Sequence, residues 1–278
     1  MRLAHNLTGP SAGTKRPAVM LLTKNVVWGA LLLLCFAACV EPSTEHRVRA
    51  NAFLRGGDAQ SALKECELGL TQKKRDTSLL LLKGKALFEL ARYVDARVAY
   101  DSALEGEGRR EDNALADAYV GLAMIASREG DFEVARKNFE VLARINPKDA
   151  SSQLNVARAC LSLGDLGCAT SHAEEAGRLR GNDEAVLYTL GTVYLASNKL
   201  KDAELTFGHI CEVIPNAASC PYGKALVAAK SGDKERALRD LAEAVRRKLP
   251  NRESIATERA FEGLRDDPES KRAVGASP

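Results

Sequence analysis

The sequence predicts an all-α protein: a solenoid of stacked helix-turn-helix hairpins closed by a C-terminal capping helix. Alanines recur 34 residues apart, with a single spacing of 39. Small residues lie 12 positions before each of these alanines, and Gly-Asp pairs precede four of them by one fixed offset. Self-similarity at a period of roughly 20–50 residues is typical of repeat proteins, in which each hairpin buries its apolar face against its neighbours. The recurring alanines are Ala62, Ala96, Ala135, Ala169, Ala203 and Ala237.

Composition excludes several classes of protein. The chain has 278 residues, of which 45% are apolar and 28% charged, as in folded globular proteins. A net charge of +3 is too small to favour nucleic-acid binding, and 5% aromatic residues are few for base stacking. Residues 1–38 contain four basic and no acidic side chains, so the remainder has a formal charge of −1. The single tryptophan, Trp28, also lies in this N-terminal stretch.

The N-terminal stretch has the layout of a secretory signal. Lys24 precedes an apolar run from Val26 to Ala38 that ends in small residues. This run is shorter than the roughly 20 residues that a membrane-spanning helix needs. We therefore expect 1–38 to be a signal peptide rather than a permanent anchor, with Met20 as an alternative true start.

The residues Phe36-Ala37-Ala38-Cys39 resemble the lipobox of bacterial lipoproteins. The resemblance implies cleavage before Cys39, lipid on that cysteine, and a short tether over 39–45. It also implies a periplasm-facing lipoprotein of the bacterial cell envelope, and Val40 after the cysteine favours the outer membrane by analogy. The alternative is an ordinary cleaved signal followed by a chance cysteine.

The repeated positions have a common physical explanation. Each unit consists of an apolar stretch of helical period, a turn, and a second such stretch. Glycine in the turn accepts the left-handed backbone that ends the first helix, and the following Asp can cap the second. Ala91-Arg92 and Asn198-Lys199 fill this turn in two units. Proline at 147 and 215 blocks further helix, and each therefore closes a unit.

This pattern resembles the tetratricopeptide repeat. One unit reads Leu187…Leu190-Gly191…Tyr194…Ala203…Phe207…Pro215, and another reads Tyr119…Leu122-Ala123…Ala135…Phe139…Pro147. The resemblance implies a right-handed superhelix of repeats spanning 43–251. The six units are 43–76, 77–110, 116–149, 150–183, 184–217 and 218–251, and a five-residue insertion, 111–115, separates the second from the third.

The segment after the repeats predicts an end cap. Residues 252–268 read as one amphipathic helix, with Ile255, Phe261 and Leu264 placed to cover the last hairpin. Residues 269–278 are expected to form a flexible tail. The first and sixth units are atypical, with Arg49 and Pro221 in positions that are otherwise apolar or aromatic, as end repeats often are.

No catalytic motif stands out, and we predict neither enzymatic activity nor a cofactor. The sequence has no glycine-rich phosphate loop, HExxH motif or nucleophile elbow. Cys168 and His172 are four residues apart on one predicted helix and could share a face as metal ligands. A lone pair without a second ligand pair is far more often structural, so no metal site is predicted.

The cysteines of the repeats offer two candidate disulfides. Cys211 and Cys220 flank a short loop between antiparallel segments, and Cys160 and Cys168 lie across a turn. A periplasmic location would permit such bonds. Cys66 would remain a buried free thiol. The alternative is that all five cysteines simply fill the core.

The resemblance also implies a binding surface, because first helices line the concave side of such solenoids. Carried over position by position, this surface combines apolar groups with a row of basic ones. It predicts a protein or peptide partner with apolar and acidic residues; the alternative is a solvated face whose apolar members are covered by their neighbours. The predicted groove residues are Lys85, Phe88, Met124, Arg128, Leu154, Arg158, Leu161, Tyr188, Leu195, Tyr222, Leu226 and Lys230.

Two functions follow as hypotheses. The first is a non-catalytic, lipid-anchored scaffold in the periplasm that binds another envelope protein through this groove. The second is an assembly lipoprotein similar to the pilotins of type IV pili, which are also lipoproteins of six such repeats and escort secretin subunits. Neither involves nucleic acid, and the lipid anchor is the only predicted contact with a membrane.

Overall fold

The computed structural model describes residues 42–106, 113–250, 255 and 258–264. The predicted signal segment 1–38, Cys39 and the tail 269–278 lie outside these residues. Within the described ranges the secondary structure consists of α-helices and 3-10 helices, and no strand occurs there. The α-helices are α2 (Pro42–Arg55), α3 (Ala59–Gln72), α4 (Thr77–Glu89), α5 (Tyr93–Gly106), α6 (Ala116–Glu129), α7 (Phe132–Ile145), α8 (Ala150–Ser162), α9 (Leu166–Leu179), α10 (Glu184–Ala196), α11 (Leu200–Val213), α12 (Ser219–Ser231) and α13 (Lys234–Arg246).

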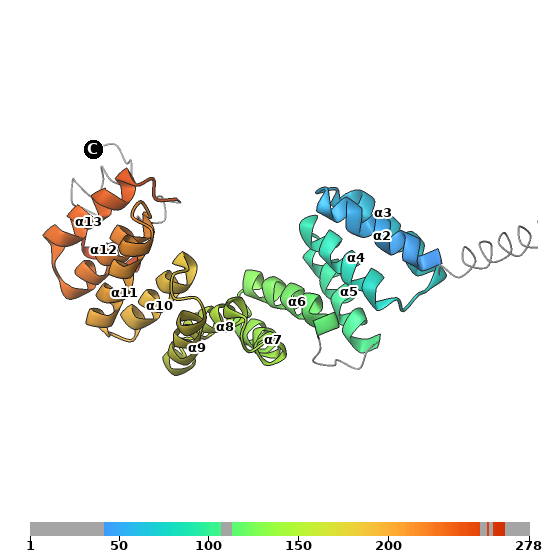
Figure 1. Cartoon of the computed structure of the whole chain (residues 1–278), viewed down its shortest axis with the longest axis horizontal. Helices are drawn as coiled ribbons and strands as arrows, with labels where there is room; N and C mark the ends of the chain where they lie inside the picture. Colours follow the sequence, from blue (N-terminus) through green and yellow to red (C-terminus); the bar gives the residue numbers. More distant parts are fainter. Residues whose placement is uncertain (1–41, 107–112, 251–254, 256–257, 265–278) are drawn as a thin grey trace, which may run out of the picture.

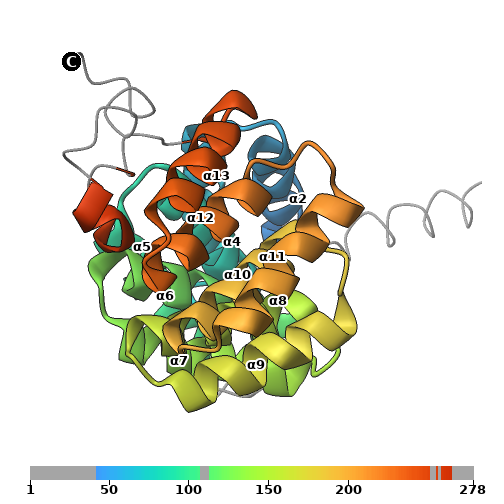
Figure 2. The ribbon, with the colours of Figure 1, turned by 90° about the vertical axis from the view of Figure 1, so that its left-hand side faces the viewer.

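The helices form six consecutive hairpins, which confirms the predicted all-α solenoid. Each hairpin packs mainly against the hairpins before and after it in the sequence. Figure 1 shows the result as an arch, with α2–α5 in one arm, α6–α9 across the base and α10–α13 in the other arm. Viewed from the side, in Figure 2, the hairpins wind around a common axis.

The turn inside each hairpin has the predicted chemistry. Gly57, Gly130, Gly164 and Gly232 have φ between +75° and +84°, which glycine adopts without steric cost. The Asp that follows each glycine accepts a hydrogen bond from the backbone N–H three residues later, at 3.0–3.1 Å. These Asp side chains therefore cap the second helices of four hairpins.

Two aromatic side chains join neighbouring hairpins, each by packing against a pair of glycines. A Cβ added to Gly84 or Gly121 would lie within 2.5 Å of the Tyr100 ring, and one added to Gly191 or Gly223 would lie within 2.6 Å of Phe207. Each ring thus packs against the first helix of its own hairpin and the first helix of the next. The absence of a side chain at these glycines allows this close approach.

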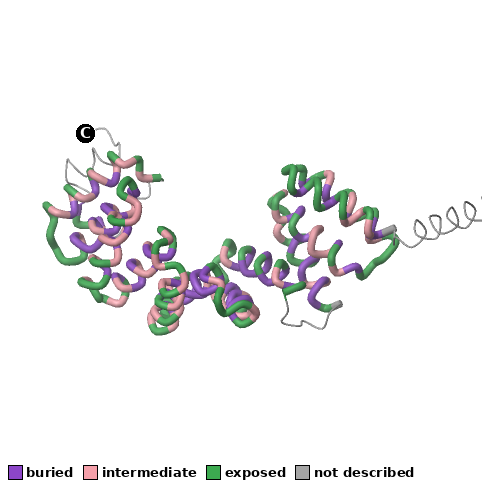
Figure 3. Tube along the Cα trace, viewed as in Figure 1, coloured by how far each residue is buried: buried purple, intermediate pink, exposed green. Residues whose placement is uncertain are grey.

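The core lies between the helices and divides into separate apolar clusters. Buried residues lie on the sides of the helices that face one another, and the outer sides are exposed (Figure 3). One large apolar cluster spans the first four hairpins and includes Val193 of α10, and a second spans the last two hairpins. This distribution is expected of a solenoid, in which each repeat contacts only its neighbours.

The C-terminal segment differs in part from the prediction. The sequence indicates one helix over 252–268, but the described part of this segment forms a short 3-10 helix, Arg259–Leu264. Ile255, Phe261 and Leu264 are nevertheless buried, at 1–4% exposure, in the cluster of the last two hairpins. Burial of these three side chains against α12 does not require a regular α-helix. The cap is therefore present with a tighter local geometry than expected.

The end of the predicted 111–115 insertion is also described. Asn113–Leu115 form a 3-10 turn, η2, that leads directly into α6. Leu115 is buried in the main cluster, so the insertion is fastened at its C-terminal end. None of the helices in the described part of the chain combines the length and apolarity that crossing a membrane requires.

Candidate peptide-binding groove

A cavity of about 410 Å³ opens between the first helices of the second, third and fourth hairpins. Helix α4 contributes one side chain, while α6 and α8 contribute most of the walls and α7 the floor. It lies near the middle of the chain, where α6–α8 form the base of the arch (Figure 1). The lining residues are Phe88, Met124, Ser127, Arg128, Phe132, Phe139, Asn155, Arg158, Ala159 and Ser162.

The cavity has an apolar floor. Phe139 is buried at 6% exposure, whereas Met124 is exposed at 44% and is available for contact. Phe88 packs edge-on against Tyr93, with ring centroids 5.4 Å apart, so its position is fixed by a neighbour. An apolar surface of this kind, held in place by packing, suits an aliphatic or aromatic side chain of a partner.

The rim of the cavity is positively charged. The Arg128 guanidinium lies 5.0 Å from the centroid of the Tyr93 ring, in a cation–π arrangement. Arg158 Nε donates a hydrogen bond to Thr189 Oγ1 at 3.2 Å. Both side chains are thus oriented by partners that carry no negative charge, and no lining residue is acidic. A ligand carboxylate could accept hydrogen bonds from the other N–H groups of these two guanidinium groups.

Arg158 stays charged in this setting. Desolvation lowers the pKa of its guanidinium, and the nearby charge of Asp183 opposes this effect. The side chain keeps accessible surface, but the surrounding protein excludes part of the water around its guanidinium. An arginine remains protonated at neutral pH even after such a shift. The partial desolvation strengthens its attraction for an anion.

Four of the twelve predicted groove residues meet at this cavity: Phe88, Met124, Arg128 and Arg158. Lys85 lies instead in a second hollow, of about 560 Å³, between α2 and α4. Leu161 is half-buried against the main core cluster. The structure therefore brings the central part of the predicted surface together and separates it from the N-terminal end.

Three predicted groove residues are buried instead. Leu154, Leu195 and Leu226 have 7%, 9% and 6% exposure, because each packs into the core clusters between neighbouring hairpins. They support the wall of the solenoid and present no side chain to a partner. Helical periodicity places these leucines on the correct face but does not show how far the next helix covers them.

The concave positions of the last two hairpins are covered by the chain itself. Tyr222 packs edge-on against Phe261 of the C-terminal segment, with ring centroids 6.0 Å apart, and Tyr188 packs against Phe207 at 5.7 Å. Desolvation, together with the charge of Glu258, raises the pKa of Tyr188 to about 12. Lys230 Nζ donates to the Leu195 carbonyl at 2.7 Å. We therefore place the open groove at α4–α8.

Apart from Arg158, sequence reasoning missed the residues that α7 and α8 add to the cavity. Phe132 and Phe139 belong to a second helix, which the family pattern assigns to packing rather than to the concave side. Asn155 and Ser162 are polar positions on a first helix without a distinctive signal. Phe139 occupies the recurring bulky position after Ala135, and this was the only signal that could have pointed to it.

Both candidate cysteine pairs form disulfides in the structure. The Cα atoms are 5.8 Å apart in Cys160–Cys168 and 5.5 Å apart in Cys211–Cys220. The first bond joins the two helices of one hairpin, and the second joins α11 to α12 of the next hairpin. Cys66 is a buried free cysteine, and burial raises the pKa of its thiol to about 12.

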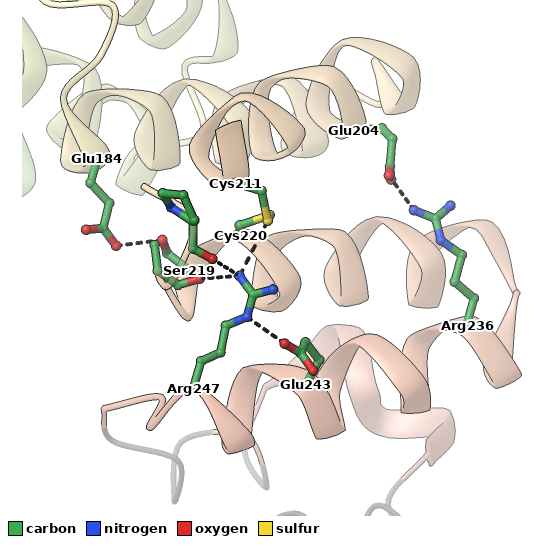
Figure 4. Close-up of a disulfide and its surroundings, with 10 residues drawn as sticks. Glu184, Glu204, Cys211, Ser219, Cys220, Arg236, Glu243 and Arg247 are labelled. Atoms are coloured by element: carbon green, nitrogen blue, oxygen red, sulfur yellow. Dashed lines mark hydrogen bonds and ion pairs between the residues drawn. A yellow bond between two sulfur atoms is a disulfide. The ribbon is translucent and has the colours of Figure 1, made fainter. Parts of the chain in front are cut away.

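Arg247 reinforces the junction that Cys211–Cys220 closes (Figure 4). Its Nη1 donates to the Pro215 carbonyl at 2.7 Å and lies 3.6 Å from Cys211 Sγ, while its Nε donates to Glu243 at 2.6 Å. The loop between the fifth and sixth hairpins is therefore held by a covalent bond and by one arginine.

The alternative of a metal site at Cys168 and His172 finds no support in the geometry. Cys168 is bonded to Cys160, and His172 Nδ1 is 2.7 Å from Gln153 Oε1. Among the described residues, no group of three His, Cys, Asp or Glu side chains could hold a metal ion.

Comparisons with known proteins agree with this architecture. A profile of the tetratricopeptide repeat matches residues 120–182, which contribute α6–α8 to the cavity. The search of curated protein sequences finds no match. A tetratricopeptide repeat protein from Parabacteroides merdae aligns with a TM-score of 0.69 at 15% identity, over 85% of this chain and 93% of its own.

Two further solved structures have informative descriptions. PilW, described as a widely conserved type IV pilus biogenesis factor, aligns with a TM-score of 0.62 at 15% identity, over 81% of this chain and 99% of its own. YrrB, described as a TPR protein with an unusual peptide-binding site, aligns with a TM-score of 0.55 at 20% identity, over 67% of this chain and 93% of its own. At these identities the likeness establishes the fold alone.

Proposed function

Because this chain is a tetratricopeptide repeat protein, we propose that it is a non-catalytic scaffold that binds another protein through the cavity between α4, α6, α7 and α8. The observation that carries the proposal is the pairing of an apolar floor with two oriented arginines and no lining carboxylate. Proteins of this fold bind peptides or proteins, and an exposed apolar surface with a polar rim is typical of such binding.

The chemistry of the cavity defines the partner. An apolar side chain would lie against Phe139 and Met124, while a carboxylate a short distance along the peptide would pair with Arg128 or Arg158. The partner segment is therefore an extended or helical peptide with apolar and acidic residues. We place this partner among the proteins of the bacterial envelope, because the leader pattern ending at Cys39 favours a lipoprotein facing the periplasm at the outer membrane.

A charge-swap experiment tests the groove. Peptides of matched sequence, with Glu or with Gln beside one aromatic residue, are titrated into the protein and binding is followed by fluorescence anisotropy. The Glu peptides should bind more tightly. In Arg128→Glu/Arg158→Glu this preference should disappear, with a loss of roughly tenfold or more in affinity for the acidic peptides.

Lys137→Glu provides the matched control. Lys137 is an exposed cation on α7, outside the cavity lining, so the same kind of charge reversal there should leave peptide binding unchanged. Equal affinity for Glu and Gln peptides in the unmodified protein would exclude the acidic partner. Equal loss in both variants would show a general charge effect rather than a site.

A pilotin-like assembly function is the second candidate. The whole-length alignment with PilW, which covers 99% of that chain, is the observation that favours it. In cells that carry a type IV pilus secretin, deletion of this protein should then abolish secretin multimers, and restoration of the protein should recover them. Normal secretin multimers in the deletion strain would eliminate this candidate while leaving the groove proposal intact.

A further inference from the structure

The two disulfides of this chain close loops of nearly equal length. The bonded cysteines are 8 residues apart in Cys160–Cys168 and 9 residues apart in Cys211–Cys220. The stability gained by closing a loop depends on this separation, so it is nearly the same for the two bonds. A large difference in how readily they are reduced would therefore come from the local environment of the sulfur atoms.

The charged groups beside the two bonds differ in sign. Arg247, at the end of α13, places its Nη1 3.6 Å from Cys211 Sγ (Figure 4). At the other bond the Asp165 carboxylate accepts from the Cys168 backbone N–H at 3.0 Å, and Arg136 Nη1 lies 3.7 Å from the second oxygen of that carboxylate. A cation thus contacts a sulfur atom directly at Cys211–Cys220, whereas a carboxylate lies next to Cys168.

The acidic groups near Arg247 do not cancel its charge. Arg247 Nε donates to Glu243 Oε1 at 2.6 Å, and Arg246 pairs with the second oxygen of the same carboxylate. Two arginines and one glutamate leave one net positive charge beside the disulfide. Glu212, next to Cys211 on α11, is 76% exposed, so solvent screens its charge.

The two sulfur atoms of this bond also differ in access. Cys220 is fully buried, whereas Cys211 is half-buried. Glu184 lies on the Cys220 side of the junction, where it accepts a hydrogen bond from Ser219 Oγ at 2.6 Å. A thiolate from solution therefore reaches Cys211 first, and the guanidinium of Arg247 attracts its negative charge.

We propose that Cys211–Cys220 is a redox-sensitive latch, which a dithiol reductant opens by exchange at Cys211, with Arg247 as its positioning residue. The attacking thiolate bonds to Cys211 Sγ and breaks the disulfide, so Cys220 leaves with the electron pair and takes up a proton. The second thiolate of the reductant then attacks the reductant's own sulfur in the mixed disulfide and releases Cys211 as a thiolate. The reductant loses two electrons and becomes a disulfide, and its second proton goes to solvent.

Arg247 acts in both redox states of the latch. In the oxidised protein its Nη1 donates to the carbonyls of Pro215 and Ala217, at 2.7 and 3.4 Å, and so fixes the loop between the two cysteines. In the reduced protein the Cys211 thiolate gains an ion pair with a guanidinium that is only 25% exposed, and this favours reduction. The same ion pair keeps Cys211 in place for reoxidation. This inference depends on neither the peptide groove nor the lipid anchor.

A redox titration of the full chain tests the latch. The protein is equilibrated at pH 8 with mixtures of reduced and oxidised dithiothreitol, and free thiols are then alkylated. Mass spectrometry of tryptic peptides gives the reduced fraction of each cysteine pair separately. In the parent protein Cys211–Cys220 should be reduced at a higher potential than Cys160–Cys168.

Arg247→Met separates the effect of charge from that of packing, because the two predict opposite signs. Loss of the charge disfavours the reduced pair, so the latch should become harder to reduce, by roughly fivefold in the exchange equilibrium or about 20 mV. Loss of the loop contacts alone would let the two thiols separate and would make the bond easier to reduce. Arg247→Lys, which keeps the charge, should stay close to the parent value.

Arg246→Met is the matched control. Arg246 also pairs with Glu243 but is 76% exposed and does not contact the sulfur, so its removal should leave the potential of the latch unchanged. Cys160–Cys168 serves as an internal reference, and its potential should be the same in every variant.

Three results would overturn the inference. The first is a latch that is no easier to reduce than Cys160–Cys168 in the parent protein. The second is an Arg247→Met latch that is unchanged or easier to reduce, and the third is failure of the bond to form in excess oxidised dithiothreitol. If Arg247→Met does not fold, the potential of Cys160–Cys168 shifts as well, and the parent protein and Arg247→Lys then decide the question.

Discussion

Tyr100 and Phe207 show how strongly a single position in this fold can depend on its neighbour. Each ring fills the space between two glycines on successive first helices, at distances that leave no room for a methyl group. The volume that each ring occupies is thus provided by a glycine of its own hairpin, 16 positions before the ring, and by a glycine of the next hairpin. A change at either member of such a pair affects the contact between two hairpins.

Gly121→Ala is expected to destabilise the protein by about 1–3 kcal/mol, because the new Cβ would lie 2.2 Å from the Tyr100 ring and force a shift. Gly167→Ala is the control: its Cβ would meet nothing closer than 3.7 Å, and alanine is the better helix former, so stability should rise by up to about 1 kcal/mol. Urea unfolding of both variants measures the difference. Equal stabilities would contradict the close packing at Tyr100.

The tyrosines of the covered end predict a loss of stability at alkaline pH. The pKa of Tyr188 is raised to about 12, mainly by desolvation, against about 10 in an unfolded chain. The unfolded state therefore releases this proton first, so the contribution of Tyr188 is intact below about pH 10 and is lost as the pH rises toward 12. In Tyr188→Phe, the decline of the unfolding free energy between about pH 9 and 11 should be shallower. A slope identical to that of the parent protein would exclude this role.

For single residues, periodicity identifies which face of a helix a side chain is on. It does not show whether neighbouring helices bury that side chain. Arg128 and Arg158 were predictable as groove residues because a charged side chain on a concave face stays near solvent. Leu154 and Leu226, which also lie on first helices, are buried because an apolar side chain packs into the space that the neighbouring helices offer. Which apolar residue remains exposed, as Met124 does, depends on packing between hairpins that the sequence pattern does not encode.

At the scale of the element, turn chemistry is the most predictable feature. The Gly-Asp turns and their caps follow from backbone geometry alone. Ala91 and Asn198 adopt φ of 58° and 59°, so the two departures from glycine keep the same left-handed conformation. Asp76, Asp149 and Asp183 also cap first helices, a role that the repeat pattern alone did not assign to them.

The strained turn at Ala91 provides a test of this geometry. Ala91→Gly should stabilise the protein by about 1 kcal/mol, because glycine has no Cβ penalty in the left-handed region. The reciprocal change Gly130→Ala should destabilise it by a similar amount, and no neighbour within 4 Å of the added Cβ would complicate the comparison. Thermal unfolding of the two variants gives the result. Changes of the same sign would contradict the assignment of strain to φ.

The C-terminal segment shows the limit of prediction for an element. Amphipathic spacing correctly selects Ile255, Phe261 and Leu264 as the buried side chains. It does not fix the backbone that presents them, since residues three apart lie close to one face in both α and 3-10 geometry. The packing of Phe261 against Tyr222, which covers one end of the predicted groove, arises from tertiary contacts alone.

At the scale of the whole molecule, stability depends on the junctions between hairpins. Because a solenoid has few contacts between distant repeats, a weakened junction permits one end to open while the other stays folded. Cys211–Cys220 and Arg247 together hold the junction of the last two hairpins. The separate apolar cluster of these hairpins suggests the unit that would open.

Replacing Cys211 and Cys220 by Ala should lower stability by about 2.5 kcal/mol, the value expected for a crosslink with a sequence separation of 9. The protection of backbone amides from hydrogen exchange should fall in α10–α13 and remain unchanged in α2–α7. Cys66→Ala, which affects a free cysteine, controls for the loss of a buried sulfur. Reduction adds two hydrogen atoms to each oxidised pair, so the intact mass should rise accordingly with reductant; no difference would show that the pairs are already reduced.

The buried cluster of Ile255, Phe261 and Leu264 also has a consequence for how copies of the chain meet. A stack of identical hairpins exposes, at its last unit, the same surface that every internal unit uses to receive a neighbour. Left open, such a surface would accept the first hairpin of another molecule and start a head-to-tail fibre. The short C-terminal segment occupies that surface and therefore blocks the addition of another hairpin. Head-to-tail growth through this surface would require the segment to leave it first.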